Sequence, residues 1–219
     1  MIEFEGIKFR WLGHDGFLIT DTSGKTVCID PYNVKGSFDP VDVVVSTHEH
    51  GDHCSLEDLK KFVSSKTDII GISMARNTLE KLDCKEIHYV SPGDKITVGS
   101  IPFEIVVAYN VNKFRSPGVP FHPKEDKKIG VVFELDGIRI YHAGDTDNIP
   151  EMQNIQTDVA LLPVSGTYVM TADEAIEAAE VLKPKLAIPM HFGAIVGDRS
   201  MAEKFGKGVT CAVRIPKLE

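Results

Sequence analysis

The ten residues STHEHGDHCS, at positions 46–55, place three histidines and two carboxylates within six consecutive positions. They overlap the end of a continuous apolar run, VDVVVSTH (41–48), which predicts a strand buried on both faces. The segment that follows, SLEDLKKFVSS (55–65), predicts a helix with Ser55 as its N-cap. We therefore expect the histidine-rich segment in a strand-to-helix loop.

The side chains of this loop have the chemistry of metal ligands. Neutral imidazole and carboxylate groups suit zinc and similar divalent ions. In an extended segment alternate side chains point the same way, so His48 and His50 can face one metal ion. A turn at Gly51 can then direct Asp52 and His53 towards a second point nearby. Because the whole chain has only eight histidines, this spacing indicates a metal site rather than a surface loop of chance composition.

The overall composition limits the classes of function. The chain has 219 residues, of which 42% are hydrophobic and 26% charged, as in ordinary globular proteins. Its net charge of −8 argues against broad binding to nucleic acid. No apolar run approaches the roughly 18–20 residues of a membrane span, and the start, MIEFEGIKFR, does not resemble a secretory signal. The four cysteines form no CxxC pair, which favours a reducing cytoplasm.

The rest of the chain has two parts, each with β-rich segments followed by alternating strands and helices. Strands are expected within 4–21, at 26–31 and at 68–74, a short helix at 75–82, further strands between 86 and 142 with a hairpin turn at Asp136-Gly137, a helix at 171–183 capped by Thr171 and Glu174, and a strand ending at His191. The segment 111–126 is expected to be a long loop, and long loops are often functional. Nothing marks a linker, so we expect one domain over residues 1–219, with two sheets inside and helices outside.

The motif H-x-H-x-D-H after a buried strand resembles the signature of the metallo-β-lactamase superfamily. IYHAGDTD (140–147) is similar to the later GDT motif of that superfamily, and AIPMHFG (187–193) is similar to its late strand that ends in a metal-binding histidine. RWLGHDGFLI (10–19) and CIDP (28–31) resemble the opening strands of the branch with ascorbate-6-phosphate lactonase-like and phospholipase D-like hydrolases. The resemblance covers nearly the whole chain in order. It implies an α/β, four-layer αββα fold, with two mixed β-sheets sandwiched between helices.

The resemblance also implies a site for two divalent metal ions, with Zn²⁺ favoured over Mn²⁺ or Fe²⁺. Its ligands would be His48, His50 and a third histidine for one ion, Asp52, His53 and His191 for the other, and Asp145 as a bridge between them.

The third histidine is where this sequence departs from the usual pattern of the family. The strand FEIVVAYN, which would normally supply it, ends in Asn110. The nearest histidine is His122, in the proline-rich segment VPFHPK. We favour His122 as the ligand because imidazole binds zinc far better than a neutral amide does. Asn110 stays the alternative, with a role in orienting a ligand or contacting substrate.

Other residues have weaker predicted roles near the same site. The resemblance places His14 near the mouth of the metal site, where it would contact substrate or support a ligand. Tyr168 follows a strand end that faces the same rim, and we expect it to contact substrate. Asp30 ends a buried strand, and a buried carboxylate needs partners, so it is expected to hold a ligand histidine in its tautomer. His142 is a second candidate for such support. His88 lies in a strand without a partner motif, and we expect a structural role for it.

The implied chemistry is hydrolysis by a metal-bridged hydroxide, with Asp52 orienting the hydroxide as well as binding metal. The favoured substrate is a small ester, lactone or phosphodiester. The alternative is a phosphodiesterase or nuclease acting on RNA or DNA, supported only by local basic patches such as KFR (113–115) and HPKEDKK (122–128). A di-iron redox protein of the same fold is disfavoured, because such relatives carry Glu in place of His50 and a flavin domain. The sequence leaves open both the oligomeric state, with a homo-oligomer as one option, and the identity of the substrate.

Overall fold

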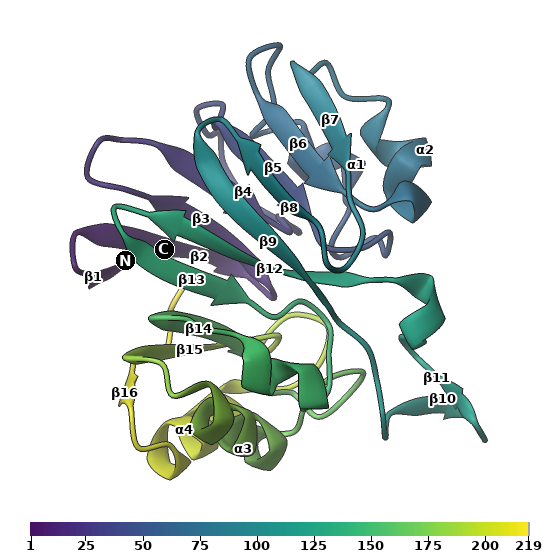
Figure 1. Cartoon of the computed structure of the whole chain (residues 1–219), viewed down its shortest axis with the longest axis vertical. Coiled ribbons are helices and arrows are strands. Elements are labelled where there is room, and N and C mark those ends of the chain that lie inside the picture. The colour runs from purple at the N-terminus through teal and green to yellow at the C-terminus, as the bar shows by residue number, and fades with distance from the viewer. Residues whose placement is uncertain (219) are drawn as a thin grey trace.

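Two seven-stranded mixed β-sheets face each other in the computed structural model, which describes residues 1–218 (Figure 1). In the first sheet the strands follow the chain in order, antiparallel from β1 to β4 and parallel from β4 to β7. These strands are β1 (Ile2–Phe4), β2 (Ile7–Gly13), β3 (Gly16–Thr20), β4 (Thr26–Ile29), β5 (Val43–Ser46), β6 (Asp68–Gly71) and β7 (Glu86–Tyr89).

The second sheet repeats this arrangement, with the order β16-β15-β14-β13-β12-β9-β8. Pairing is antiparallel from β8 through β9 and β12 to β13, and parallel from β13 to β16. Its strands are β8 (Lys95–Val98), β9 (Ile101–Val107), β12 (Ile129–Leu135), β13 (Ile138–His142), β14 (Val159–Pro163), β15 (Leu186–Met190) and β16 (Ala212–Val213). The predicted hairpin is confirmed, since Asp136 and Gly137 both adopt positive φ between β12 and β13.

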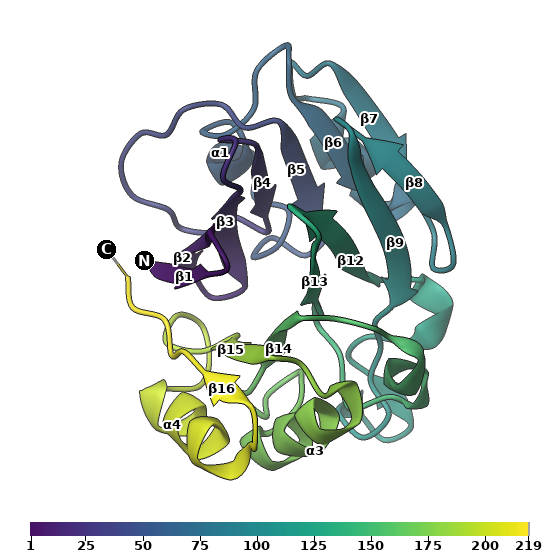
Figure 2. The ribbon, with the colours of Figure 1, turned by 60° about the vertical axis from the view of Figure 1, so that its left-hand side comes forward.

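Helices cover the outer faces of the two sheets (Figure 2). Helices α3 and α4 pack against β14 and β15, and α2 packs against β6. The α-helices are α1 (Leu56–Leu59), α2 (Arg76–Leu79), α3 (Ala172–Leu182) and α4 (Arg199–Gly208), and the 3-10 helices are η1 (Ser73–Ala75), η2 (Lys124–Asp126) and η3 (Pro150–Asn154). The predicted capping box of α3 is present, with Thr171 and Glu174 each satisfying a backbone N–H of the other. Within residues 1–218 no helix combines the length and the apolar character that crossing a membrane requires.

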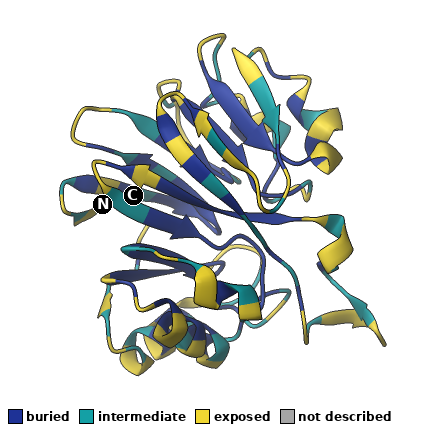
Figure 3. Cartoon of the chain, viewed as in Figure 1, coloured by how far each residue is buried: buried dark blue, intermediate teal, exposed yellow. Residues whose placement is uncertain are grey.

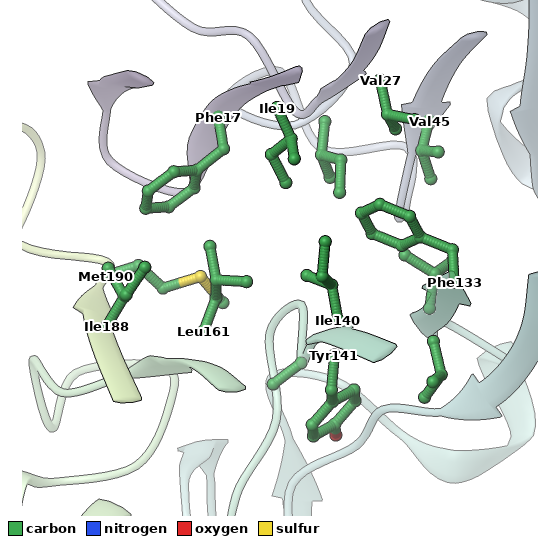
Figure 4. Close-up of a cluster of buried hydrophobic side chains, with 14 of the residues drawn as sticks. Phe17, Ile19, Val27, Val45, Phe133, Ile140, Tyr141, Leu161, Ile188 and Met190 are labelled. Carbon is green, nitrogen blue, oxygen red and sulfur yellow. The ribbon is translucent and has the colours of Figure 1, made fainter. Parts of the chain in front are cut away.

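The hydrophobic core lies between the sheets (Figure 4). Phe17, Ile19 and Val45 of the first sheet point towards Phe133 and Leu161 of the second. The strands at the centre of each parallel half, β5, β14 and β15, are buried at every position, because helices or loops cover their other face (Figure 3). These observations confirm the predicted αββα arrangement, in which both sheets share one core.

Two predicted local structures are wrong. The helix expected over 55–65 is the four-residue α1, although its predicted N-cap is present, with the Ser55 hydroxyl accepting from the backbone N–H of Asp58. After Leu59 the backbone tightens to 3-10-type hydrogen bonds, and the carbonyl of Phe62 accepts from the N–H of Val41 at 2.8 Å. This hydrogen bond to the segment leading into β5 draws the chain away from a helical path.

The second difference is in the expected loop 111–126. It contains a small antiparallel hairpin of β10 (Phe114–Ser116) and β11 (Val119–Pro120), followed by η2. The turn at Gly118, whose φ is +75°, reverses the chain between the two strands. The hairpin projects beyond the two sheets (Figure 1) and leads directly into His122.

Candidate metal centre

The predicted ligands come from four separate segments that follow strands. His48 to His53 follow β5, His122 follows β11, Asp145 follows β13 by three residues, and His191 directly follows β15. Because the neighbouring strands β13, β14 and β15 run parallel, their carboxyl ends lie at one edge of the second sheet. The segment after β5 reaches the same edge, since the N–H of Ile129 at the start of β12 donates to Thr47 O.

The first histidine cluster consists of His48, His50 and His122, whose ligand atoms lie within 4.8 Å of one another. His48 Nε2 is 3.1 Å from His50 Nδ1. Burial lowers the pKa of all three imidazoles, that of His122 to about 4. They are therefore neutral at pH 7, the form that binds metal.

The second cluster consists of His53, His191 and Asp145, joined by the carboxylate of Asp52. Both His53 Nε2 and His191 Nε2 lie 3.4 Å from Asp145 Oδ1. Asp52 Oδ2 is 3.6 Å from His53 Nε2. Burial alone would raise the pKa of Asp52, but a hydrogen bond from His14 and the charge of His53 lower it to about 2. Asp52 is thus ionised at neutral pH.

Asp145 stands between the two clusters. Its Oδ2 is 3.4 Å from His122 Nε2 in the first cluster, while its Oδ1 faces the second. Three buried atoms that point into this centre have no hydrogen-bond partner among residues 1–218, namely His53 Nε2, His191 Nε2 and Asp145 Oδ1. Buried polar atoms without partners are costly. The donor set and these lone pairs fit two bound divalent cations bridged by one carboxylate.

The charges of the second cluster support this interpretation. Burial raises the pKa of Asp145, but His53 and His191 outweigh it and bring the pKa well below its usual value. Conversely, burial lowers the pKa of His53 and His191, while the nearby carboxylates, Asp145 above all, raise it overall. Protons on these imidazoles balance the buried carboxylates when no metal is bound, and a metal ion would replace them.

Asp30 orients one histidine of each cluster. Its fully buried Oδ2 accepts from His53 Nδ1 at 2.8 Å and from the Thr47 hydroxyl at 2.6 Å. The Thr47 oxygen in turn lies 3.1 Å from His48 Nδ1, which donates to it. Both imidazoles are therefore held with Nε2 directed at the centre, and the predicted role of Asp30 as a tautomer-setting carboxylate agrees with this geometry.

Replacing Asp30 with Asn should weaken metal binding by about 10- to 100-fold, because an amide presents one acceptor where the carboxylate presents two. Competition with a chromophoric chelator measures this affinity. Asp42→Asn is the matched control: Asp42 accepts from Thr26 at the other end of β4 and contacts no ligand. Equal affinities in the two variants would show that Asp30 does not support the metal.

His122 is held by Asn110, and the structure places His122 beside His48 and His50 in the first cluster. The backbone N–H and Nδ1 of His122 both donate to Asn110 Oδ1, at 2.9 and 3.0 Å. This leaves His122 Nε2 facing Asp145. Asn110 Nδ2 donates to the carbonyl of Tyr168 at 2.7 Å, and the ring of Tyr168 packs edge-on against Phe121. Tyr168 is thus tied to the His122 loop through its backbone and ring.

His14 and Ser165 flank His191. The Ser165 hydroxyl accepts from His191 Nδ1 at 2.9 Å, while the carbonyl of His14 accepts from the His191 N–H at 3.2 Å. The His14 ring lies 4.1 Å from the His191 ring, and its Nε2 is 3.3 Å from Asp52 Oδ2. His14 is buried, and its ring packs against His191 beside Asp52.

Several of these residues adopt left-handed backbone conformations. The φ angles of His14, Asp30, Tyr168 and His191 are +50°, +43°, +69° and +58°. Non-glycine residues rarely adopt this region, and such strain persists only where surrounding structure imposes it. His14, Asp30 and His191 directly follow β2, β4 and β15, whereas the carbonyl of Tyr168 accepts from Asn110.

Two charged residues near the centre escaped prediction. Asp15 is fully buried, neither of its oxygens has a hydrogen-bond partner among residues 1–218, and it lies 3.8 Å from His53 Nδ1. Burial raises the pKa of Asp15 well above its usual value. Lys128 is buried and pairs with Glu49 at 2.6 Å, and the same carboxylate oxygen of Glu49 lies 3.7 Å from His50 Nε2. For Asp15 the only hint in the sequence was its position next to His14. Asp is common in such turns, so this position did not predict a buried carboxylate.

The remaining histidines take structural positions. His142 is fully buried, accepts from Gly144 N–H through Nδ1 and donates through Nε2 to the carbonyl of Asp15. It therefore fastens the turn at Asp15 to the loop that carries Asp145, without a free nitrogen for metal. His88 lies on β7, 3.4 Å from Asp68 of β6, away from the two clusters.

Known proteins share this fold and this arrangement of the chain. The family model of the β-lactamase superfamily domain matches residues 8–191 of this chain. A UPF0173 metal-dependent hydrolase of Methanoculleus marisnigri is 31% identical, over 97% of this chain and 93% of its own. Another, from Archaeoglobus fulgidus, is 32% identical over 93% of this chain and 90% of its own.

A solved structure from Parabacteroides distasonis, assigned as a metal-dependent hydrolase, has a TM-score of 0.80 and 30% identity, covering 97% of this chain and 94% of its own. The superfamily predicted from the motifs is thus confirmed, whereas the lactonase-like branch stays a prediction. The chain belongs to the β-lactamase superfamily and, within it, to the UPF0173 family of metal-dependent hydrolases.

Proposed function

We propose that this chain is a binuclear hydrolase of small esters, lactones or phosphodiesters that works with two divalent ions, zinc in the first place. The observation that carries the proposal is the position of Asp145, which offers one oxygen to each cluster. The proposed ligands of one ion are His48, His50 and His122, those of the other are Asp52, His53 and His191, and Asp145 is shared.

Divalent ions held by these residues would supply an activated water and polarise the oxygen of the scissile group. The chain's own residues supply the orientation. Asp52, ionised and held by His14, can accept a hydrogen bond from the attacking water and fix its direction. Asp30, Asn110 and Ser165 keep the imidazoles in place through their second nitrogens. In this proposal His14 and Tyr168 border the substrate, with Tyr168 at the loop that carries His122.

The site is accessible to small substrates. His50 and Asp52 have side chains that are 44% and 24% exposed, whereas the other proposed ligands are buried. The centre therefore opens to solvent at the H-x-H-x-D-H loop, where a scissile bond could approach.

The alternative of an RNA or DNA phosphodiesterase finds less support. Each of the two basic patches that favoured it has a lysine paired within the chain: Lys113 pairs with Glu174 at 2.7 Å, and Lys124 pairs with Glu151 at 2.6 Å. Phosphate-backbone binding needs cations that are free to contact phosphates. We propose a small-molecule partner rather than a nucleic acid.

The test is a substrate panel with protein reconstituted in Zn²⁺ or Mn²⁺. It comprises 4-nitrophenyl butyrate, a γ-lactone, bis(4-nitrophenyl) phosphate and single-stranded RNA. We expect turnover of an ester, lactone or phosphodiester that a chelator abolishes and that Asp52→Asn lowers by about 100-fold or more. Failure of metal-loaded protein to hydrolyse any of the three small substrates would contradict the proposal, and turnover of RNA alone would favour the nuclease.

A further inference from the structure

A cavity of about 340 Å³ adjoins the metal centre. It is enclosed by the end of β2, the loop after β4, the segment after His191, and Leu218. Gly13 and Gly193 in its wall are one and two residues from His14 and His191. The ring of Tyr32, also in the wall, is 6.1 Å from the His14 ring. The cavity therefore continues outward from the residues that hold the second ion.

Two aromatic side chains in its wall, Trp11 and Phe38, pack against other aromatic rings. Trp11 stacks on Phe192 with ring centroids 4.9 Å apart, and Phe38 packs on Phe62 at 4.6 Å. The segment with Leu218 closes one side; Figure 2 shows this segment beside the N-terminal strands. A cavity of this size, rigid and aromatic, suits an aryl or alkyl group of a small molecule.

Two cations at the same cavity have no carboxylate partner among residues 1–218. Among residues 1–218 no carboxylate lies within 4.0 Å of Arg10 or Lys35, and Lys35 donates only to Asn33 Oδ1, at 2.9 Å. The guanidinium of Arg10 lies over the ring of Phe38, 4.9 Å from its centroid. In a chain of net charge −8, two cations without a carboxylate partner among residues 1–218, beside a cavity with aromatic walls, favour an anionic ligand group.

A larger cavity, of about 510 Å³, lies on the outer face of β9 and β12, and two of its three cations are paired with carboxylates. Its Lys124 pairs with Glu151 at 2.6 Å, and its Arg139 pairs with Glu104 at 3.1 Å. None of its lining residues is next to His14 in the sequence or within two residues of His191, whereas Gly13 and Gly193 line the smaller cavity. The smaller cavity is thus the one whose charge and position call for a ligand.

We propose that the cavity between Arg10 and Lys35 binds the non-reacting part of the substrate, an apolar aryl or alkyl group that carries an anionic head group. This inference rests on the proposed hydrolase and names its substrate class, amphiphilic anionic esters or lactones. The apolar group lies against Trp11 and Phe38, the anion meets Arg10 and Lys35, and the scissile bond lies towards His14 and Asp52.

The chain offers a direct reporter, because Trp11 is its single tryptophan and lines the cavity. Metal-loaded protein is titrated with 4-phenylbutyrate and with its neutral counterpart 4-phenylbutanol, and the fluorescence of Trp11 is followed. We expect both to perturb the emission and the acid to bind about tenfold more tightly, since a charged hydrogen bond distinguishes the two. Equal affinity of acid and alcohol would overturn the proposal.

Variants separate the cavity cations from the metal. Arg10→Gln should bring the affinities of acid and alcohol close together, and Lys35→Gln, at an exposed position, should reduce their ratio without risk to folding. The matched control Arg115→Gln, on exposed β10, should keep the full ratio. If the preference for the acid remained in Arg10→Gln but was lost when a chelator removed the metal, the carboxylate would bind the metal. That result would contradict the proposal.

Kinetics distinguish this inference from the proposed function. With an ester whose acyl chain ends in a carboxylate, Arg10→Gln should raise KM about tenfold and leave kcat unchanged, because the contact is equal in ground and transition states. The control Arg115→Gln, on exposed β10, should change neither value with either ester. If hydrolysis of the anionic ester does not depend on Arg10, the cavity assignment alone is wrong. If no ester is hydrolysed at all, the proposed hydrolase is wrong. The fluorescence titration then still tests whether the cavity binds the anion.

Discussion

Asp145→Asn is expected to lower hydrolytic activity by about a thousandfold or more, since the loss of several kcal/mol of charge stabilisation translates into rate at tenfold per 1.36 kcal/mol. In the native chain one oxygen of Asp145 faces His122 and the other faces His53 and His191. An amide offers one oxygen and no negative charge, so it cannot serve both clusters. Metal content should fall below two ions per chain along with the activity.

The control for this variant is Asp147→Asn, two residues further along the same loop. Asp147 is equally buried, but its Oδ2 accepts from the N–H groups of Val111 and Asn112, and it contacts no ligand. Asn at this position can keep the oxygen acceptor. If Asp147→Asn lost as much metal as Asp145→Asn, the loss would reflect damage to the loop rather than removal of a bridging ligand.

Metal binding is expected to raise the thermal stability of the chain strongly. With free metal at about 1,000 times its dissociation constant, the folded state gains about 4.1 kcal/mol. For a chain of this size this corresponds to a rise in Tm of roughly 8–16 °C. Calorimetry before and after chelation measures the difference, and an unchanged Tm would show that no ion binds the folded centre.

The gain in Tm should shrink at lower pH. Neighbouring carboxylates raise the pKa values of His53 and His191 above their usual range, so protons compete with the metal for these two imidazoles as the pH falls through those values. A difference in Tm that is independent of pH would contradict their role as ligands. Asp145→Asn should show a smaller difference than the native chain at every pH.

The sequence predicted the parts of the centre that are encoded locally. His48, His50, Asp52 and His53 occupy one short loop, and the motif around Asp145 is equally compact. Strand ends could be placed because β5, β13 and β15 are apolar runs that stop in polar residues. His122 was predicted as well, although it departs from the usual position, because only one histidine stood near the expected strand.

The supporting residues depended on tertiary structure and were harder to predict. In the sequence Asp15 looks like an ordinary turn residue, and only the fold shows that it is buried beside His53. Lys128 and Glu49 are far apart in sequence and meet only because β12 starts against the loop that follows β5. The shortened α1 has a similar cause, since a hydrogen bond from Val41 to Phe62 overrides helical propensity. Long-range contacts of this kind leave no periodic trace in a single sequence.

Metal content per chain, by elemental analysis of protein purified without added metal, tests the account most directly. We predict about two divalent ions in the native chain and about one fewer in His122→Ala, because His122 completes the first cluster with His48 and His50. Two ions in both proteins would remove His122 from the ligand set. No metal in either protein, even after reconstitution, would contradict the binuclear hydrolase altogether.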